Sequence, residues 1–165
     1  MTQEKLACFK AYDIRGRVPQ DLNEDIAYKI GRAYVAEFAP QGPVAVGRDV
    51  RTTSKSLAEA LRRGLNEGGT DTRDIGMCGT EVVYYAASRE NMGGGIMVTA
   101  SHNPMEYNGM KFVRAGATPI SGDTGLKALE RRVREEDLGD TASQPGTNSE
   151  EDLVADYVQR LLAFV

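Results

Sequence analysis

Short apolar runs alternate along this chain with stretches whose apolar residues recur every three or four positions. The short runs, such as residues 43–47 and 96–98, are typical of buried strands. The periodic stretches, such as residues 23–38, are typical of helices with one apolar face. The pattern predicts strands at residues 8–12, 43–47, 70–75, 96–98 and 110–113, and helices at residues 23–38, 54–67, 80–88, 121–136 and 150–164.

The order of these elements determines the expected fold class. Strands alternate with helices over most of the chain, which favours a sheet with parallel neighbours and helices on both faces. We therefore expect an α/β fold, a three-layer α/β/α domain with a mostly parallel mixed sheet of about four strands. Residues 1–138 make up this domain. Residues 139–149 lack periodicity and predict a mobile loop, and residues 150–165 predict a helix leading towards a missing second domain.

Polar residues at the start of two predicted helices are candidate caps. Asn23 or Asp21 is placed to cap the helix at residues 23–38, and Ser54 is placed to cap the next one. The side chains of Asn, Asp and Ser can accept hydrogen bonds from the free N–H groups of a first helical turn.

Composition narrows the function classes. The chain has 165 residues, with 20 basic and 24 acidic side chains and a net charge of −4, and no basic run that would favour a nucleic-acid partner. No apolar run approaches the ~20 residues of a membrane span, and the N-terminus lacks the apolar core of a signal peptide. Cys8 and Cys78 form no Cys-x-x-Cys pair and are interpreted as reduced thiols of a cytoplasmic protein.

A serine follows the strand predicted at residues 96–98. Glycines precede that strand, and the turn signal Asn108-Gly109 follows, so residues 99–104 (TASHNP) form a loop at the carboxyl end of a strand. Ligands bind at this edge in open α/β sheets. Ser101 is therefore the leading candidate for a functional side chain.

Acyl transfer is a poor fit to this serine. A nucleophilic serine needs a base within hydrogen-bond reach, and the only histidine is its neighbour, His102. Adjacent side chains on an extended segment point to opposite sides, so we expect His102 to be badly placed as that base. The Gly-x-Ser-x-Gly pattern of the α/β hydrolases is also missing.

Phosphoryl transfer asks for a carrier oxygen, backbone N–H groups, cations and usually a metal ion. Cations close to glycine-containing turns are Arg15, Arg48, Arg51 and Lys111. On residue pattern alone, the loop could equally be structural, with Ser101 capping a turn and Arg15 forming a salt bridge with Asp13.

Four motifs, in order, resemble those of the α-D-phosphohexomutases. Residues 98–111 (VTASHNPMEYNGMK) are similar to the family's phosphoserine loop, in the form found in bacterial phosphomannomutases. Residues 12–16 (YDIRG) resemble its N-terminal arginine loop, and residues 46–51 (VGRDVR) resemble the loop after the next strand. Residues 74–76 (DIG) and 79–81 (GTE) resemble the segment that leads to the family's third helix. The resemblance runs from about residue 9 to about residue 132.

The resemblance implies an enzyme that interconverts the 1- and 6-phosphates of a hexose through a phosphoserine and a hexose 1,6-bisphosphate intermediate. Ser101 matches the serine that carries the phosphoryl group. Arg15 matches a catalytic arginine whose planar fork suits phosphate oxygens. Lys111 matches a lysine that helps proton transfer, a role that suits a compact cation.

The same resemblance implies further contacts to the phosphate. Tyr12 and Arg48 match residues that bind the phosphoryl group or the hexose phosphate substrate, and His102 and Asn103 shape the loop. The family also uses Mg²⁺, to which Ser101 or its phosphate would contribute an oxygen.

The chain departs from the family in extent. Family members have about four domains, and their magnesium is held by an Asp-Gly-Asp-Gly-Asp cluster that this chain does not contain. We expect the first domain of a phosphomannomutase, inactive without the remaining mutase domains. Alternatives are the equivalent domain of a phosphoglucomutase or phosphoglucosamine mutase, and a non-catalytic module that binds sugar phosphates.

Overall fold

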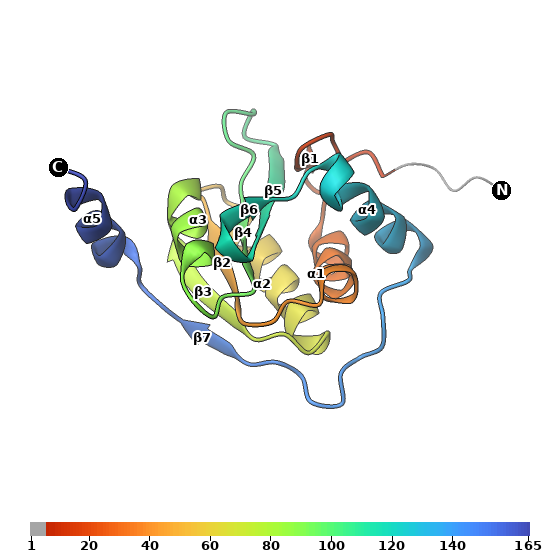
Figure 1. The fold of residues 1–165 in the computed structure, drawn as a ribbon. Coiled ribbons are helices and arrows are strands. Elements are labelled where there is room, and N and C mark those ends of the chain that lie inside the picture. Colours follow the sequence, from red (N-terminus) through yellow and green to blue (C-terminus); the bar gives the residue numbers. More distant parts are fainter. Residues whose placement is uncertain (1–5) are drawn as a thin grey trace.

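A seven-stranded mixed sheet forms the centre of the part of the chain that the computed structural model describes, residues 6–165 (Figure 1). Its strands are β1 (Ile14–Arg17), β2 (Val44–Arg48), β3 (Thr72–Met77), β4 (Gly94–Val98), β5 (Tyr107–Arg114), β6 (Thr118–Pro119) and β7 (Asn148–Glu150). The spatial order is β1-β5-β4-β2-β3-β7, with β6 paired to β5. Strands β4, β2, β3 and β7 run parallel to one another, and the pairs that involve β5 are antiparallel.

Four α-helices and two short 3-10 turns, Ala115–Ala117 and Gly122–Thr124, connect these strands, and a fifth α-helix follows β7. The helices are α1 (Glu24–Phe38), α2 (Ser54–Glu67), α3 (Thr80–Ser88), α4 (Leu126–Glu135) and α5 (Val154–Leu162). Helices α1, α2 and α4 share one hydrophobic cluster, while α3 and the start of α5 share another. The two clusters lie on opposite faces of the sheet. Successive side chains of β2 point to opposite faces, so Val44 and Val46 belong to the first cluster and Ala45 to the second. The predicted α/β class and three layers are confirmed.

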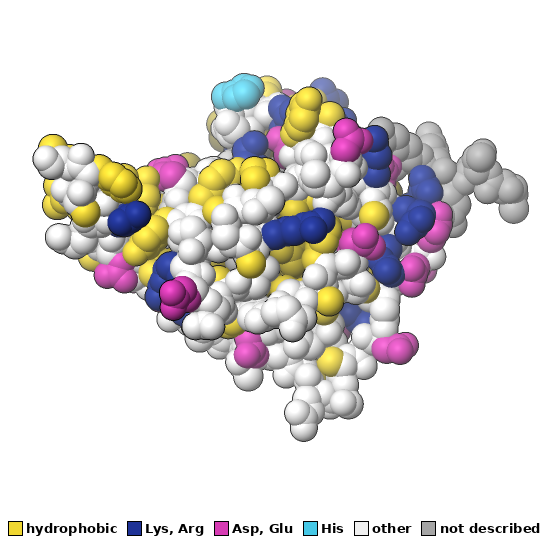
Figure 2. Space-filling model, viewed as in Figure 1, with side chains coloured by type: hydrophobic (Ala, Val, Ile, Leu, Met, Phe, Trp, Pro, Cys, Tyr) yellow, Lys and Arg dark blue, Asp and Glu magenta, His cyan; other side chains and the backbone are white. Residues whose placement is uncertain are grey.

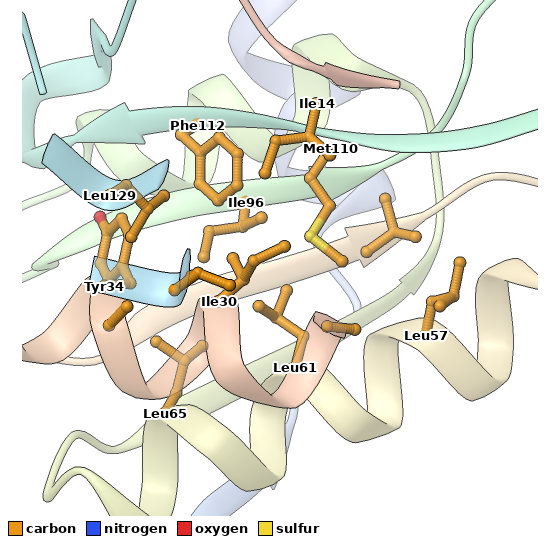
Figure 3. Close-up of a cluster of buried hydrophobic side chains, with 14 of the residues drawn as sticks. Ile14, Ile30, Tyr34, Leu57, Leu61, Leu65, Ile96, Met110, Phe112 and Leu129 are labelled. Atoms are coloured by element: carbon orange, nitrogen blue, oxygen red, sulfur yellow. The ribbon is translucent and has the colours of Figure 1, made fainter. Parts of the chain in front are cut away.

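The larger core lies between the sheet and the first pair of helices. Figure 3 shows Ile30 and Tyr34 of α1 and Leu61 of α2 directed towards Ile96 of β4 and Phe112 of β5. These side chains are almost completely buried. Each such aliphatic or aromatic side chain contributes about 1.5–3 kcal/mol to folding when it leaves water. The core therefore holds β4 rigidly below the serine loop.

Two glycines bring the backbones of α1 and α2 together. A Cβ atom on Gly31 would fall on the carbonyl oxygen of Leu61, and a Cβ atom on Gly64 would fall on that of Tyr28. The helices cross where neither residue has a side chain, so this contact is between backbones.

Helix starts agree with the sequence at one position and differ at another. Asn23 caps α1, as predicted, because its side-chain oxygen accepts a hydrogen bond from Ile26 N at 3.0 Å. The prediction that Ser54 caps α2 is wrong. Thr53 precedes the helix without a side-chain cap bond, and the Ser54 hydroxyl instead donates to Asp49 at 2.5 Å.

The first predicted strand is displaced along the chain. Residues 8–12 form only an isolated bridge, from Phe9 to Ile14, and the strand proper is β1 at Ile14–Arg17. Its position is set by pairing with β5, in which Ile14 lies opposite Met110. Cys8 and Phe9 are buried in the core ahead of it.

The end of the chain contains a strand where only a loop was predicted. Residues 139–149 run into β7, which pairs in parallel with β3, and Asp71 accepts hydrogen bonds from Thr147 N and Oγ1 at 2.7 and 2.9 Å. Together with β1 and β6, this exposed strand explains why the sheet has more than about four strands. Helix α5 begins at Val154 rather than at residue 150. Within residues 6–165, no helix has both the length and the apolar character needed to cross a bilayer.

Candidate active site at the serine loop

Ser101 lies on the loop that joins β4 to β5, at the carboxyl edge of the parallel strands. This edge also carries the end of β2, because Arg48 pairs with Val98. Thr99 and Ala100 are buried, whereas Ser101 and His102 are exposed. The loop projects from the sheet in Figure 1, and its histidine stands at the molecular surface in Figure 2. The serine hydroxyl is therefore accessible to a ligand.

Hydrogen bonds fold this loop into a tight turn. Ser101 N donates to Thr99 Oγ1 at 2.9 Å, and Thr99 Oγ1 donates to Asp49 Oδ2 at 2.7 Å. Asn103 closes the turn, because its backbone N and its Nδ2 donate to Ala100 O at 3.0 and 2.8 Å. Asn103 thus shapes the loop by direct contact.

The expected separation of Ser101 and His102 is not observed. Ser101 Oγ lies 3.3 Å from His102 Nδ1. Ser101 has a φ angle of +55°, so the segment is not extended and the two neighbouring side chains can meet. Among residues 6–165, no carboxylate accepts a hydrogen bond from this imidazole, so the loop does not form the oriented triad that acyl transfer uses.

One buried carboxylate gathers two of the predicted cations. Asp13 Oδ1 accepts from Arg15 Nε at 3.0 Å, and Asp13 Oδ2 lies 3.3 Å from Lys111 Nζ. Asp13 is 6% exposed, while the side chains of Arg15 and Lys111 keep 37% and 32% of their surface in water. The pairing of β1 with β5 produces this arrangement across 98 residues of sequence. The Arg15–Asp13 salt bridge that the sequence left open is present.

Among residues 6–165, two other predicted side chains form no hydrogen bond or ion pair with Asp13, Arg15 or Lys111. Arg48 lines a hollow of about 510 Å³ together with acidic side chains that include Asp74, Glu151 and Asp152. Tyr12 is 79% exposed on the loop before β1. The roles of Arg48 and Tyr12 in binding phosphate stay predictions.

Ser101 and Asn103 line a second hollow of about 560 Å³. Its wall includes Met97, Met105 and Cys78. Burial raises the pKa of the Cys78 thiol to about 11, and the neighbouring Glu81 carboxylate adds to this effect. At neutral pH this thiol is therefore protonated and a weak nucleophile.

Arg51 and Asp49 are the residues whose part in this site was missed or misjudged. Arg51 was predicted as a free cation, but its guanidinium is directed at backbone carbonyls of the serine loop. Asp49 links that arginine to Thr99. The available signal was their position, since polar residues that follow parallel strands meet at one edge of the sheet.

The next question is whether the described side chains could bind a magnesium ion. No group of three or more His, Cys, Asp or Glu side chains in residues 6–165 is arranged to hold a metal ion. Magnesium prefers several carboxylate, phosphate or water oxygens in octahedral geometry. The described residues therefore do not by themselves form a magnesium site.

Comparison with known proteins decides the family. Residues 7–140 match the family described as "Phosphoglucomutase/phosphomannomutase, alpha/beta/alpha domain I". The chain belongs to the phosphoglucomutase/phosphomannomutase family. Ser101, Arg15 and Lys111 all lie inside the matched range, and the resemblance drawn from the four motifs is confirmed.

Individual members of the family agree with this assignment. A phosphomannomutase from Escherichia coli is 53% identical over 166 residues, which span all of this chain and 36% of that protein. A phosphomannomutase from Klebsiella pneumoniae is 61% identical over 135 residues, or 82% of this chain and 84% of that protein. The crystal structure of a phosphoglucomutase/phosphomannomutase family protein from Burkholderia thailandensis superposes with a TM-score of 0.86 and 36% identity, covering 94% of this chain and 35% of that one. The chain thus spans about a third of the E. coli relative.

Proposed function

We propose that this chain is the serine-bearing first domain of a phosphomannomutase that interconverts mannose 6-phosphate and mannose 1-phosphate. The observation that carries the proposal is the exposed Ser101 hydroxyl, held on a tight turn at the ligand-binding edge of the sheet, inside the range that matches the family's first domain. The names of the relatives from E. coli and K. pneumoniae favour mannose as the sugar.

In the proposed reaction, Ser101 starts as a phosphoserine. A hydroxyl of the bound hexose phosphate attacks phosphorus, so the phosphorus–oxygen bond to Ser101 breaks and a new one to the sugar forms. The sugar hydroxyl gives up its proton, and the released Ser101 oxygen takes one. The product is a hexose 1,6-bisphosphate, and transfer of its other phosphoryl group back to Ser101 completes the isomerisation.

Arg15 and Lys111 are the two cations that we assign to this transfer. Arg15 donates a hydrogen bond from Nε to Asp13, which leaves its two Nη groups to bind phosphate oxygens. The Lys111 ammonium group pairs with the same carboxylate. From there it can stabilise developing negative charge and exchange a proton. Asp13 therefore orients both cations.

The other roles follow from position. His102 touches the Ser101 hydroxyl and would contact its phosphate, and Asn103 holds the turn. We assign Tyr12 and Arg48 to phosphate or substrate binding from the motifs that contain them. Magnesium, when bound, would neutralise charge on the phosphoryl group, and among residues 6–165 we assign it the Ser101 oxygen or its phosphate. Two free cysteines are consistent with a cytoplasmic setting.

A chimera tests the proposal. This chain replaces the matching first third of the E. coli phosphomannomutase, and formation of mannose 1-phosphate from mannose 6-phosphate is measured with a catalytic amount of the bisphosphate. We expect the chimera to be active and Ser101→Ala to lower kcat by about a thousandfold or more, because the phosphoryl carrier is gone. Ser88→Ala, a matched change at another exposed serine, should leave kcat unchanged.

Two results would contradict the proposal: an inactive wild-type chimera, or a Ser101→Ala chimera as active as the wild type. Calorimetric titration of this chain alone with mannose 6-phosphate distinguishes a mutase domain from the non-catalytic alternative. Tight binding by the isolated chain together with an inactive chimera would favour a sugar-phosphate-binding module.

A further inference from the structure

Arg51 lies beneath the serine loop with all four N–H donors of its two Nη groups engaged. Arginine carries five N–H donors in a fixed planar fork. Nη1 donates to Pro104 O at 2.7 Å and Tyr107 O at 3.0 Å, and Nη2 donates to Ser101 O at 2.9 Å and Asn103 O at 2.6 Å. The remaining group, Nε, lies 3.3 Å from Asp49 Oδ2. Neither Nη group therefore has a donor left for a substrate phosphate.

The four carbonyl groups that Arg51 binds belong to one short segment, residues 101–107. One of them is the carbonyl of Ser101 itself, directly after a φ angle of +55° that a residue with a side chain adopts only at a cost. Asp49 secures the other side of this residue, since it accepts from Thr99, whose hydroxyl accepts from Ser101 N. Arg51 and Asp49 thus hold Ser101 from both its carbonyl and its amide.

Fixing these carbonyls also orients peptide N–H groups. In a trans peptide the N–H points opposite to the C=O. Because the carbonyls of Ser101 and Pro104 turn towards Arg51, the N–H groups of His102 and Met105 turn away from it. Neither of these two N–H groups has a hydrogen-bond acceptor among residues 6–165. Backbone N–H groups of this kind stabilise phosphoryl oxygens.

We propose that Arg51 is the positioning residue of the phosphoryl-transfer site, which sets the Ser101 turn and aims the N–H groups of His102 and Met105 at the phosphate that the serine carries. The inference rests on the proposed function and deepens it. Arg51 acts through the loop and does not touch the substrate. Loss of Arg51 should therefore slow transfer without weakening the binding of the sugar phosphate.

Kinetics of the chimera provide the first test. We expect Arg51→Gln to lower kcat at least tenfold while KM for mannose 6-phosphate stays within twofold. Arg51→Lys should not restore kcat, because three donors on one nitrogen cannot serve four carbonyls and a carboxylate. Arg62→Gln is the matched control: its side chain is also 13% exposed and pairs with a single aspartate, Asp74, at 2.8 Å. It should keep the wild-type kcat.

Amide hydrogen exchange in the isolated chain provides the second test. We expect Arg51→Gln to speed exchange of the three hydrogen-bonded loop amides, Ser101, Asn103 and Tyr107, at least tenfold and to leave amides 94–98 of β4 unchanged. Should Arg51→Gln not fold, Thr99→Val removes the hydroxyl that holds Ser101 N and should produce the same two effects.

The outcomes separate cleanly. A wild-type kcat for Arg51→Gln, or unchanged exchange in the loop, would overturn the positioning role. A KM that rises in parallel with the loss of kcat would make Arg51 a substrate ligand instead. An inactive wild-type chimera would count against the proposed function, and exchange in the isolated chain would still decide whether Arg51 holds the loop.

Discussion

At the scale of single residues, Asp13 is a side chain whose charge we expect to contribute to the stability of the fold. Its carboxylate is buried and balances Arg15 and Lys111, whose side chains are about a third exposed. We expect Asp13→Asn to lower the free energy of unfolding by about 1–2 kcal/mol, because two neighbouring cations lose their shared counter-charge.

Chemical denaturation of the isolated chain measures this effect. Asp123→Asn is a suitable control, since Asp123 pairs with Lys127 on the open surface and its removal should leave stability unchanged. Equal stability of the Asp13→Asn variant and the wild type would show that the carboxylate does not balance these cations.

Single residues were also where sequence reasoning was least complete. Ser101 could be found because it follows an apolar strand, which is a local signal. The turn predicted at Asn108-Gly109 is wrong, because both residues lie inside β5 and pair with β1. The contact of Ser101 with His102 could not be found, because it depends on a positive φ angle that no residue type here demands. Arg51 looked like any exposed cation, since its acceptors are backbone carbonyls 50 or more residues away.

At the scale of elements, local periodicity was sufficient for helices α1 to α3 and for the buried strands β2 and β4. Helix α4 begins at Leu126 rather than at residue 121, because Gly122–Thr124 form a separate 3-10 turn, and β5 begins at Tyr107 rather than at residue 110. The edge strands β1 and β7 were displaced or missed, because pairing with distant backbone defines them and their sequences carry no apolar alternation. Strand β7 owes its place partly to Glu151, which follows it and accepts hydrogen bonds from Arg73 and Arg89 at 2.9 and 2.7 Å.

The ion pairs of Glu151 with Arg73 and Arg89 predict that the stability of the fold depends on pH. Partial burial alone would raise the pKa of the Glu151 carboxyl, but the guanidinium groups of Arg89 and Arg73 outweigh it and hold the pKa below its usual 4.5. A lowered pKa in the folded state means that the pair stabilises the fold above pH 4.5 and that this is lost as the pH falls through the folded value.

We therefore expect Glu151→Gln to lower the free energy of unfolding by about 1 kcal/mol at pH 7, and the difference from the wild type to shrink below pH 4.5. Denaturant melts of both chains across this range measure it. A difference that stays constant or grows in acid would show that the interaction is not ionic.

At the scale of the whole molecule, α5 stands out because none of its residues is buried. Only its start is anchored, by the buried Leu153 and by Tyr157 against Tyr85 at 5.7 Å between ring centroids. Val158, Leu161 and Leu162 are about half exposed and form part of the apolar surface at the C-terminal end of the molecule (Figure 2).

Apolar surface of this kind favours association. We expect the isolated chain to self-associate as its concentration rises, and the pair of changes Leu161→Lys and Leu162→Lys to make it more monomeric in sedimentation velocity. Gln159→Lys, which adds charge on the same helix without removing apolar surface, should have no such effect. A wild-type chain that stays monomeric at its solubility limit would contradict the prediction.

The most direct measurement is the mass of the chimera after incubation with mannose 1,6-bisphosphate, followed by fragmentation of its peptides. The predicted result is one added phosphoryl group, located on Ser101 and absent from the Ser101→Ala variant. An active chimera that carries phosphate on another side chain, or on none, would contradict the central claim that this hydroxyl carries the phosphoryl group between the two ends of the sugar.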